Sequence, residues 1–306
     1  MSVAARWMFL NSFLAAAALA APEEPVYLEH IRTLGPVAHF RLDGLESADL
    51  ANVIPRTNVP ARSVHVDHGG QAVLSVPGPN PLDVVGTNRL NGFAMANQGL
   101  SFRHADTGRN AAVVIPGDSI PDFAGPHADA FSLSVWVKAD RLQPDRAGLV
   151  SRKAGDGLDT YQFALSLWSG RYDILLHHAD GSVRSAYPEA SPNGEWQHLV
   201  FVLDSDGWFE GEAGMMRFYV NGDRVFSGKT GNQTRTQMIP STRDVLIGGI
   251  AYGQPDEEGF NRGFNGVVDE LTLWDRALSD DEVSTLHRIA VIGRRPTAII
   301  IGSLQP

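Results

Sequence analysis

A carboxylate in the segment 267–274 has the chemistry to bind a metal ion. Read with the period-two alternation of a strand, VVDELTLW places Asp269 on one face with three aliphatic residues, Val267, Leu271 and Leu273. Glu270 falls on the other, more exposed face. An unpaired carboxylate on an apolar face is costly to bury. Asp269 therefore needs either a calcium ion, or a cap of backbone amides or an arginine partner, and the sequence leaves these open.

A calcium ion at Asp269 would need further oxygen ligands, and two other aspartates are candidates. Asp43 ends a strand candidate at 37–42, and it would lie close to Asp269 if the first and last strands are neighbours. Asp156 lies in the acidic, glycine-rich loop KAGDGLDTY, which would form either a second cation site or a plain turn. Calcium (Ca2+) is thus expected as a structural ion.

Recognition of a sugar usually combines an exposed aromatic face with polar groups. The candidates for such a surface are Tyr161, Trp168, His177, Trp208 and Tyr252. Trp208 lies in the glycine-rich segment DSDGWFEGEAG, where it is either a binding tip or an anchor on a sheet. The tryptophans that lie mid-strand among aliphatic residues are expected in the core, and these are Trp136, Trp196 and Trp274.

No catalytic arrangement is evident in the sequence. A glycosidase needs two carboxylates about 5–10 Å apart across the scissile bond, and the strand candidates carry no Glu-x-Asp-x-Glu pattern. Glu210 and Glu212 fall in a glycine-rich connection. Nucleophile elbows, His-Glu-x-x-His motifs and phosphate-binding loops are absent from the sequence, as is cysteine. We therefore expect a protein that is not an enzyme.

The composition is that of a globular protein that acts outside the cell. The chain has 306 residues, 43% hydrophobic and 20% charged, and its formal net charge of −10 argues against nucleic acid or an anionic membrane as partner. Residues 1–20 have the pattern of a signal peptide, with Arg6 before the apolar run WMFLNSFLAAAALA. We expect a linker at 21–33, one domain at 34–290 and a tail at 291–306. The mature chain is expected to lack a membrane span and to be secreted, extracellular or on a bacterial cell surface.

The elements that position these residues are mainly strands. From Gly99 onward, short runs of β-branched and aromatic residues are bounded by Gly, Asn, Asp or Pro. Asn221-Gly222 is a strong hairpin signal. Ser279 with Glu282 forms a capping box that begins one late helix. The pattern predicts an all-β fold, a two-sheet antiparallel jelly-roll sandwich with one short C-terminal helix.

The series GLSF, FSLSVWVKAD, EWQHLVFVLD, FYVNGDRV and FNGVVDELTLWDRALSDDEVSTLH resembles the LamG-like jelly-roll domains of the concanavalin A-like lectin/glucanase superfamily. The resemblance covers residues 99–287, and more loosely 37–99. It implies two curved sheets with the first strand beside the last. It also implies calcium in many members, and recognition of carbohydrate or protein on secreted and surface proteins.

Together these observations favour a secreted, non-catalytic binding module whose partner is a glycan. The alternative is a surface or particle-associated structural or adhesion protein that binds a surface protein. A glycoside hydrolase ranks third.

Overall fold

The computed structural model describes residues 25–44, 52–53, 64–66, 73–105, 110–124, 130–155, 157–204, 214–229, 238–253 and 260–293. This part of the chain forms two sheets that face each other, two short two-stranded ribbons and two α-helices. The helices are α1 (Val26–Thr33) and α2 (Asp280–Ile292), and a 3-10 turn, η1, spans Gly117–Ser119. The predicted all-β, two-sheet antiparallel class is confirmed.

The first sheet contains the elements from both ends of the described chain. Its strands lie in the order β15 (Asp223–Lys229), β14 (Met215–Val220), β13 (Trp196–Asp204), β8 (Ala130–Ala139), β19 (Gly266–Trp274), β6 (Gln98–Phe102) and β3 (Leu74–Pro77). Strand β1 (Ala38–Phe40) pairs antiparallel with β19, with Ala38 opposite Leu273. The expectation that the first strand lies beside the last is therefore confirmed.

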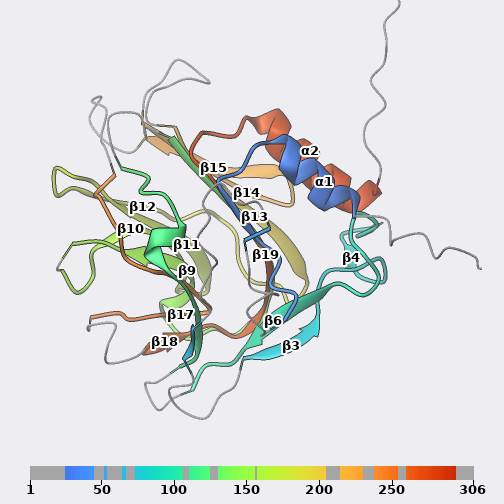
Figure 1. The fold of residues 1–306 in the computed structure, drawn as a ribbon, viewed down its shortest axis with the longest axis horizontal. Coiled ribbons are helices and arrows are strands. Elements are labelled where there is room, and N and C mark those ends of the chain that lie inside the picture. The colour runs from blue at the N-terminus through green and yellow to red at the C-terminus, as the bar shows by residue number, and fades with distance from the viewer. Residues whose placement is uncertain are drawn as a thin grey trace, which may run out of the picture.

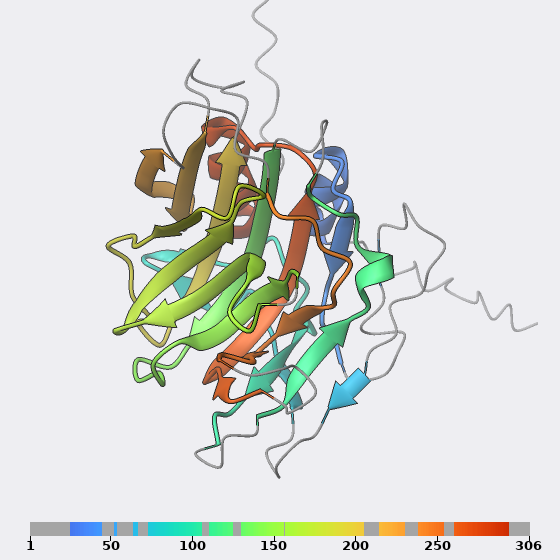
Figure 2. The ribbon, with the colours of Figure 1, turned by 90° about the vertical axis from the view of Figure 1, so that its left-hand side faces the viewer.

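The second sheet holds the middle of the chain. Its order is β12 (Val183–Ala186), β11 (Arg171–His177), β10 (Tyr161–Trp168), β9 (Ala147–Lys153), β16 (Val245–Ile247), β7 (Ala112–Ile115) and β2 (Val64–Val66). The ribbons are β17 (Gly249–Ile250) with β18 (Arg262–Gly263), and β4 (Val84–Val85) with β5 (Asn88–Arg89). In Figure 2 strands β9 to β12 face the viewer and the helices lie behind them.

The two largest apolar cores follow from this layering. The main core fills the space between the sheets and includes Phe131, Leu165, Phe201 and Leu271. A second core lies where α1 and α2 cover the outer face of the first sheet (Figure 1). It contains the expected core tryptophans, which are at most 2% exposed: Trp136, Trp196 and Trp274. The two α-helices of the described chain thus lie on the outer face of the first sheet and not on that of the second.

The hairpin turn and the helix cap that the sequence predicts are present in the structure. Asn221 and Gly222 join β14 to β15 with φ of 54° and 83°, the left-handed backbone that a two-residue hairpin needs. The Ser279 side chain accepts a hydrogen bond from the Glu282 amide, and the Glu282 side chain accepts one from the Ser279 amide. Helix α2 ends at Gly293, whose φ is 68°.

The alternation predicted for β19 is wrong beyond Asp269. Opposite β8, Asp269 pairs with Trp136 and Thr272 with Ser134, so β19 has one residue more than its partner over this stretch. The additional residue is Glu270, whose φ is 53°. Such a bulge reverses the faces that follow it. Asp269 therefore lies on the helix side of the sheet, and not with Leu271 and Leu273 in the core between the sheets.

Two further expectations need correction. Glu270 is 1% exposed and is therefore as buried as Asp269, rather than the more exposed of the two. Residues 26–33 of the predicted linker form α1, which buries Tyr27, Leu28 and Ile31 against the first sheet. Neither α1 nor α2, nor any other helix in the described ranges, is long and apolar enough to cross a membrane. The predicted signal peptide and residues 294–306 of the predicted tail lie outside the described residues.

Candidate functional site

A buried polar group, here called the chain-end cluster, joins β1, β19 and the residue that precedes β6. It consists of His39, Arg41, Asp43, Asn97, Asp269, Glu270 and Thr272. Asn97 Nδ2 donates to Asp269 Oδ2 at 2.7 Å. His39 lies between Thr272 Oγ1, at 2.7 Å from its Nδ1, and Glu270 Oε2, at 2.8 Å from its Nε2. The bulge makes this possible, because it directs two consecutive acidic side chains toward polar partners.

Arg41 supplies the positive charge of the chain-end cluster. Its guanidinium lies 3.1 Å from Asp43 and 3.5 Å from Glu270, and it donates to Asn97 Oδ1 at 2.9 Å. Burial raises the pKa of Asp269 well above its usual range, and the charges of Glu270 and Asp43 raise it further. The hydrogen bond from the Asn97 side-chain amide lowers the pKa of Asp269.

The fit of a calcium ion to the chain-end cluster can be judged from these contacts. Oδ1 of Asp269 is a buried acceptor without a hydrogen-bond partner in the described part of the chain, which favours a cation. The oxygens of Asp43, Asn97 and Glu270, however, are already engaged by Arg41. Within the described ranges no group of three or more His, Asp or Glu side chains is arranged to hold a metal ion. The residues as they lie fit a guanidinium-centred cluster better than a calcium site. Binding of calcium to this protein stays a prediction.

The second candidate site is the outer side of the second sheet, where Trp168 and Tyr252 of the predicted ligand-binding residues meet. The core-facing residues of β10 and β11 include Phe163, Leu165, Tyr172 and Ile174. By alternation, the outward positions at the hairpin end are Ser166 and Trp168 on β10, and Arg171 and Asp173 on β11. Ser166 is opposite Asp173, and Trp168 is opposite Arg171.

Arg146 adds a cation to this face that, unlike the outward Arg171, stacks on two aromatic rings. Its Cζ lies 4.3 Å from the centroid of the Trp168 ring and 4.6 Å from that of Tyr252. Tyr187 meets Trp168 edge to face, with centroids 5.2 Å apart, and is 46% exposed. We call Arg146, Trp168, Asp173, Tyr187 and Tyr252 the aromatic site. It brings together two of the predicted ligand-binding residues, Trp168 and Tyr252.

Local backbone geometry positions Arg146 and Trp168. Arg146 has a left-handed φ of 58° in the turn that precedes β9, where the Ala147 amide donates to Pro144 O. The β10–β11 hairpin turns at Ser169, whose φ is 50°. The Ser169 backbone amide donates a hydrogen bond to Asp145 Oδ1 at 3.3 Å. This bond ties the hairpin to the turn, so the guanidinium and the indole are supplied by two connected loops.

Asp173 places a buried carboxylate next to that cation. It is 2% exposed, and Oδ2 accepts from Ser166 Oγ at 3.3 Å, whereas Oδ1 is buried without a hydrogen-bond partner in the described part of the chain. Burial raises the pKa of Asp173 to about 6, while the Ser166 hydroxyl and the Arg146 charge lower it. Arg146 thus influences Asp173 without forming an ion pair with it.

The segment 249–253 forms one wall of the aromatic site. It crosses β9 at Gly148, where a Cβ would lie 2.5 Å from Ile250 Cβ, so no larger residue fits there. Asn261 fixes Tyr252 through both its backbone amide and its carbonyl, at 2.8 and 2.7 Å. Asp159 accepts from the Gly253 amide at 2.6 Å. Tyr252 is therefore held in place by contacts outside the site.

Tyr161 and His177 lie further along the same sheet. Tyr161 is 1% exposed, and its hydroxyl donates to Ala251 O at 3.0 Å, so it supports the wall rather than presenting a free ring face. His177 Nδ1 lies 3.2 and 3.1 Å from the backbone N and O of Tyr161. Burial lowers the pKa of His177. Trp208 and Asp156 lie outside the described residues.

Sequence reasoning missed three members of the aromatic site, namely Arg146, Asp173 and Tyr187. Asp173 carries a usable signal, because in RYDILLH it is a carboxylate inside an otherwise apolar strand, as Asp269 is. Arg146 and Tyr187 carry no such signal in the sequence. They reach Trp168 only because segment 249–253 crosses β9 and because β12 ends next to Trp168.

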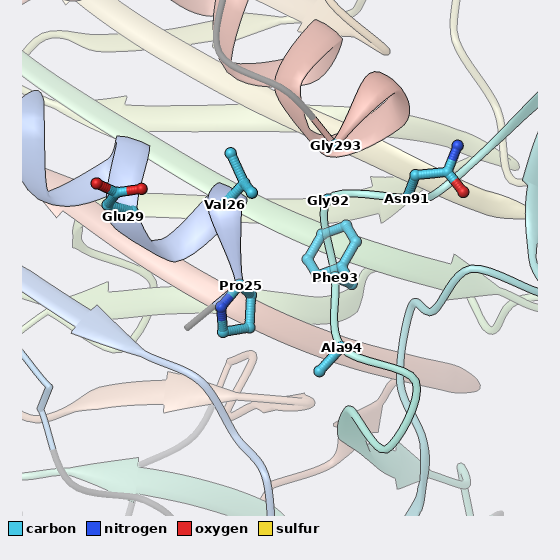
Figure 3. Close-up of a pocket in the computed structure, with 8 residues that line it drawn as sticks. All are labelled: Pro25, Val26, Glu29, Asn91, Gly92, Phe93, Ala94 and Gly293. Carbon is cyan, nitrogen blue, oxygen red and sulfur yellow. The ribbon is translucent and has the colours of Figure 1, made fainter. Parts of the chain in front are cut away.

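A cavity of about 660 Å³ lies on the other side of the molecule, at the start of α1 (Figure 3). Pro25, Val26 and Glu29 line it on the α1 side, and Asn91 to Ala94 and Gly293 line the other. Among the described lining residues Glu29 is the one that is charged. Phe93 is 5% exposed and packs on Tyr27, at a centroid distance of 4.7 Å. The described lining therefore does not combine an exposed ring with a cation, as the aromatic site does.

Comparison with known proteins agrees with this geometry. Residues 107–284 match the laminin G family of the concanavalin A-like lectin/glucanases superfamily. Two curated relatives are 25% identical: the human adhesion G-protein coupled receptor D1 over 176 residues, and the mouse pentraxin-related protein PTX3 over 184 residues. Each match covers 58% of this chain, but 18% and 45% of the relative, so the chain aligns with less than half of each.

Solved structures show the same fold at low identity. The binding domain of Paraclostridial Mosquitocidal Protein 1 superposes with a TM-score of 0.54 at 15% identity, over 82% of this chain and 52% of that one. Domain 4 of the extracellular arabinanase AbnA from Geobacillus stearothermophilus was solved with arabinotriose. It superposes with a TM-score of 0.52 at 19% identity, over 82% of this chain and 98% of that one. The binding domain of botulinum neurotoxin DC was solved with rat synaptotagmin II. It superposes with a TM-score of 0.52 at 12% identity, over 83% of this chain and 52% of that one. With residues 107–284 matched and the sheet architecture in place, the chain belongs to the concanavalin A-like lectin/glucanases superfamily.

Proposed function

We propose that this protein is a secreted, non-catalytic binding module that recognises carbohydrate at the aromatic site. The observation that carries the proposal is the stacking of Arg146 on Trp168 and Tyr252, on the sheet face opposite the one that α1 and α2 cover. Sugars present apolar C–H faces and polar edges, and a site for them needs ring surface next to hydrogen-bonding groups. Trp168 and Tyr187 supply ring surface, and Arg146 supplies donors.

The relatives support binding as the general activity. The arabinanase domain was solved with a trisaccharide and the neurotoxin domain with a protein, so this fold serves both kinds of partner. Fold alone does not choose between them. The aromatic site favours the sugar, because its ring surface lies next to a cation and a buried carboxylate rather than within a broad apolar patch.

The non-catalytic part of the proposal rests on the carboxylates of the second sheet. Strands β2, β7, β9 to β12 and β16 contain a single acidic residue, Asp173. Glycoside hydrolysis by the common mechanisms needs two carboxyl groups that flank the scissile bond. The strands of this sheet therefore supply one hydrogen-bond acceptor and no pair of carboxyl groups that could act as acid and nucleophile.

Binding to a glycan array and to immobilised polysaccharides tests the proposal. Trp168→Ala should weaken binding by about tenfold or more, because it removes both the ring surface and the support of Arg146. Leu82→Ala is the control, since Leu82 is 69% exposed and belongs to the β3–β4 connection. Thermal melting of both variants shows whether the fold is intact.

Three results would overturn parts of this proposal. No binding to any glycan, together with capture of a specific surface protein, would favour the adhesion alternative. Glycan binding that Trp168→Ala leaves intact would move the site elsewhere. Release of reducing sugar from a polysaccharide by the wild-type protein would refute the non-catalytic assignment.

A further inference from the structure

Arg146 has hydrogen-bonding capacity that the described protein does not use. Its guanidinium stacks on Trp168 and Tyr252, but it forms no hydrogen bond or ion pair with any residue in the described ranges. Asp173 lies near enough to respond to its charge, yet it does not come within ion-pair distance. A cation held by rings therefore keeps its N–H groups available.

The geometry of this contact determines what can bind. When a ring covers the flat surface of a guanidinium, the remaining approach is along its edge, where the N–H groups point. That edge forms two parallel hydrogen bonds with a carboxylate, which matches its spacing and charge. Stacking also fixes the rotamer before the ligand arrives, so less conformational entropy is lost on binding.

We propose that Arg146 binds the carboxylate of an acidic sugar, so that the ligand is a uronic acid-containing saccharide. This inference rests on the proposed function and names the class of its ligand. The ring of the same sugar would lie toward Tyr187, the most exposed aromatic side chain of the aromatic site, at 46%. The donors of Arg146 and the nearby ring surface thus match the two parts of one uronate residue.

The ring surface of the aromatic site makes a uronate the better choice than an acidic peptide. Tyr187 is 46% exposed beside Trp168, and its ring matches the flat face of a pyranose, which a peptide of acidic residues does not present. Binding of an acidic peptide instead of the saccharide is an outcome that the experiment below can detect.

The test compares one saccharide in two charge states. Oligogalacturonate and its fully methyl-esterified form share the same backbone, and only the first carries free carboxylates. We expect the wild-type protein to bind the free acid about tenfold or more tightly by calorimetry, as charge-assisted hydrogen bonds provide. Arg146→Gln should remove this preference, whereas Arg146→Lys should keep part of it because the charge remains. Both variants place a similar side chain at the same left-handed position, so they are matched for folding.

The control is Arg89→Gln, which changes the net charge equally but lies on β5, away from the second sheet. It should keep the preference for the free acid. Equal binding of the acid and the ester would overturn the inference and leave carbohydrate binding intact. Binding of a polyglutamate peptide but of neither saccharide would overturn it as well, in favour of a protein partner. No binding to these probes or to any neutral glycan would refute the inference and the proposed function together.

Discussion

Asp173→Asn tests whether the buried carboxylate of the aromatic site lowers the stability of the folded protein when it is ionised. Burial raises the pKa of Asp173 from 3.8 to about 6 in the folded protein. Between these values the folded chain holds a proton that the unfolded chain has released, so stability falls as the pH rises through this window. A difference of about two pH units corresponds to about 3 kcal/mol at 1.36 kcal/mol per unit. Above pH 7 the ionised Asp173 therefore costs about 3 kcal/mol relative to its protonated form.

The asparagine variant lacks this titration. Its neutral amide can still accept the Ser166 hydrogen bond, so any constant effect of the substitution is the same at every pH. Urea unfolding monitored by tryptophan fluorescence, at intervals from pH 4 to pH 7.5, gives the unfolding free energy of both proteins. The variant should gain about 2.4 kcal/mol on the wild type between the two ends of this range, because at pH 4 the unfolded chain has already lost more than half of this proton. Other titrating groups cancel in the difference, because the two proteins share them. A difference that stays constant within about 0.5 kcal/mol across this range would refute the assignment of a raised pKa to Asp173.

Calcium should leave the melting temperature unchanged relative to chelator if Arg41 supplies the cation of the chain-end cluster; a clear rise in millimolar calcium would show that the ion binds there. Glu270→Ala removes the partner of His39 and Arg41 and should lower the unfolding free energy by about 3 kcal/mol in urea titrations, and a loss below about 1 kcal/mol would contradict the role of the cluster. Ser279→Ala removes the cap of α2 and should cost about 1 kcal/mol in the same assay. Burial lowers the pKa of His287 from 6.5 to about 4, so its contribution to stability is present above pH 6.5 and is lost as the pH falls through about 4. His287→Phe should therefore retain stability better than the wild type on acidification, and parallel acid-unfolding curves would contradict this expectation.

The sequence predicts most of the architecture because its signals are local. Alternating strands, the Asn221-Gly222 turn and the Ser279 capping box depend on residues that are close in the chain, and each forms as predicted. The bulge at Glu270 was missed because it depends on register against β8, which no local pattern reveals. The error reverses the faces of β19 beyond Asp269 and hides the burial of Glu270.

The aromatic site shows the same limit. Trp168 and Tyr252 could be selected individually as exposed aromatic candidates, but their meeting through Arg146 depends on three loops that are distant in sequence. Helix α1 was assigned to a linker because eight residues carry a weak helical pattern, and its stability comes from packing Tyr27 and Ile31 on the first sheet. Long-range packing, rather than local preference, decides these features.

The position of β19 has a consequence for how the chain acquires its structure. Of the strands in the described ranges this one comes last along the chain, but it lies inside the first sheet, between β8 and β6, where it also pairs with β1. Until it is added, β8 and β6 each present an unpaired edge that can join another chain. Contacts between residues more than two hundred positions apart also form slowly, because a long loop must close before they contribute. A growing chain thus remains unable to complete its main sheet until residues 266–274 are available, so the partly made protein should depend on chaperones to avoid aggregation.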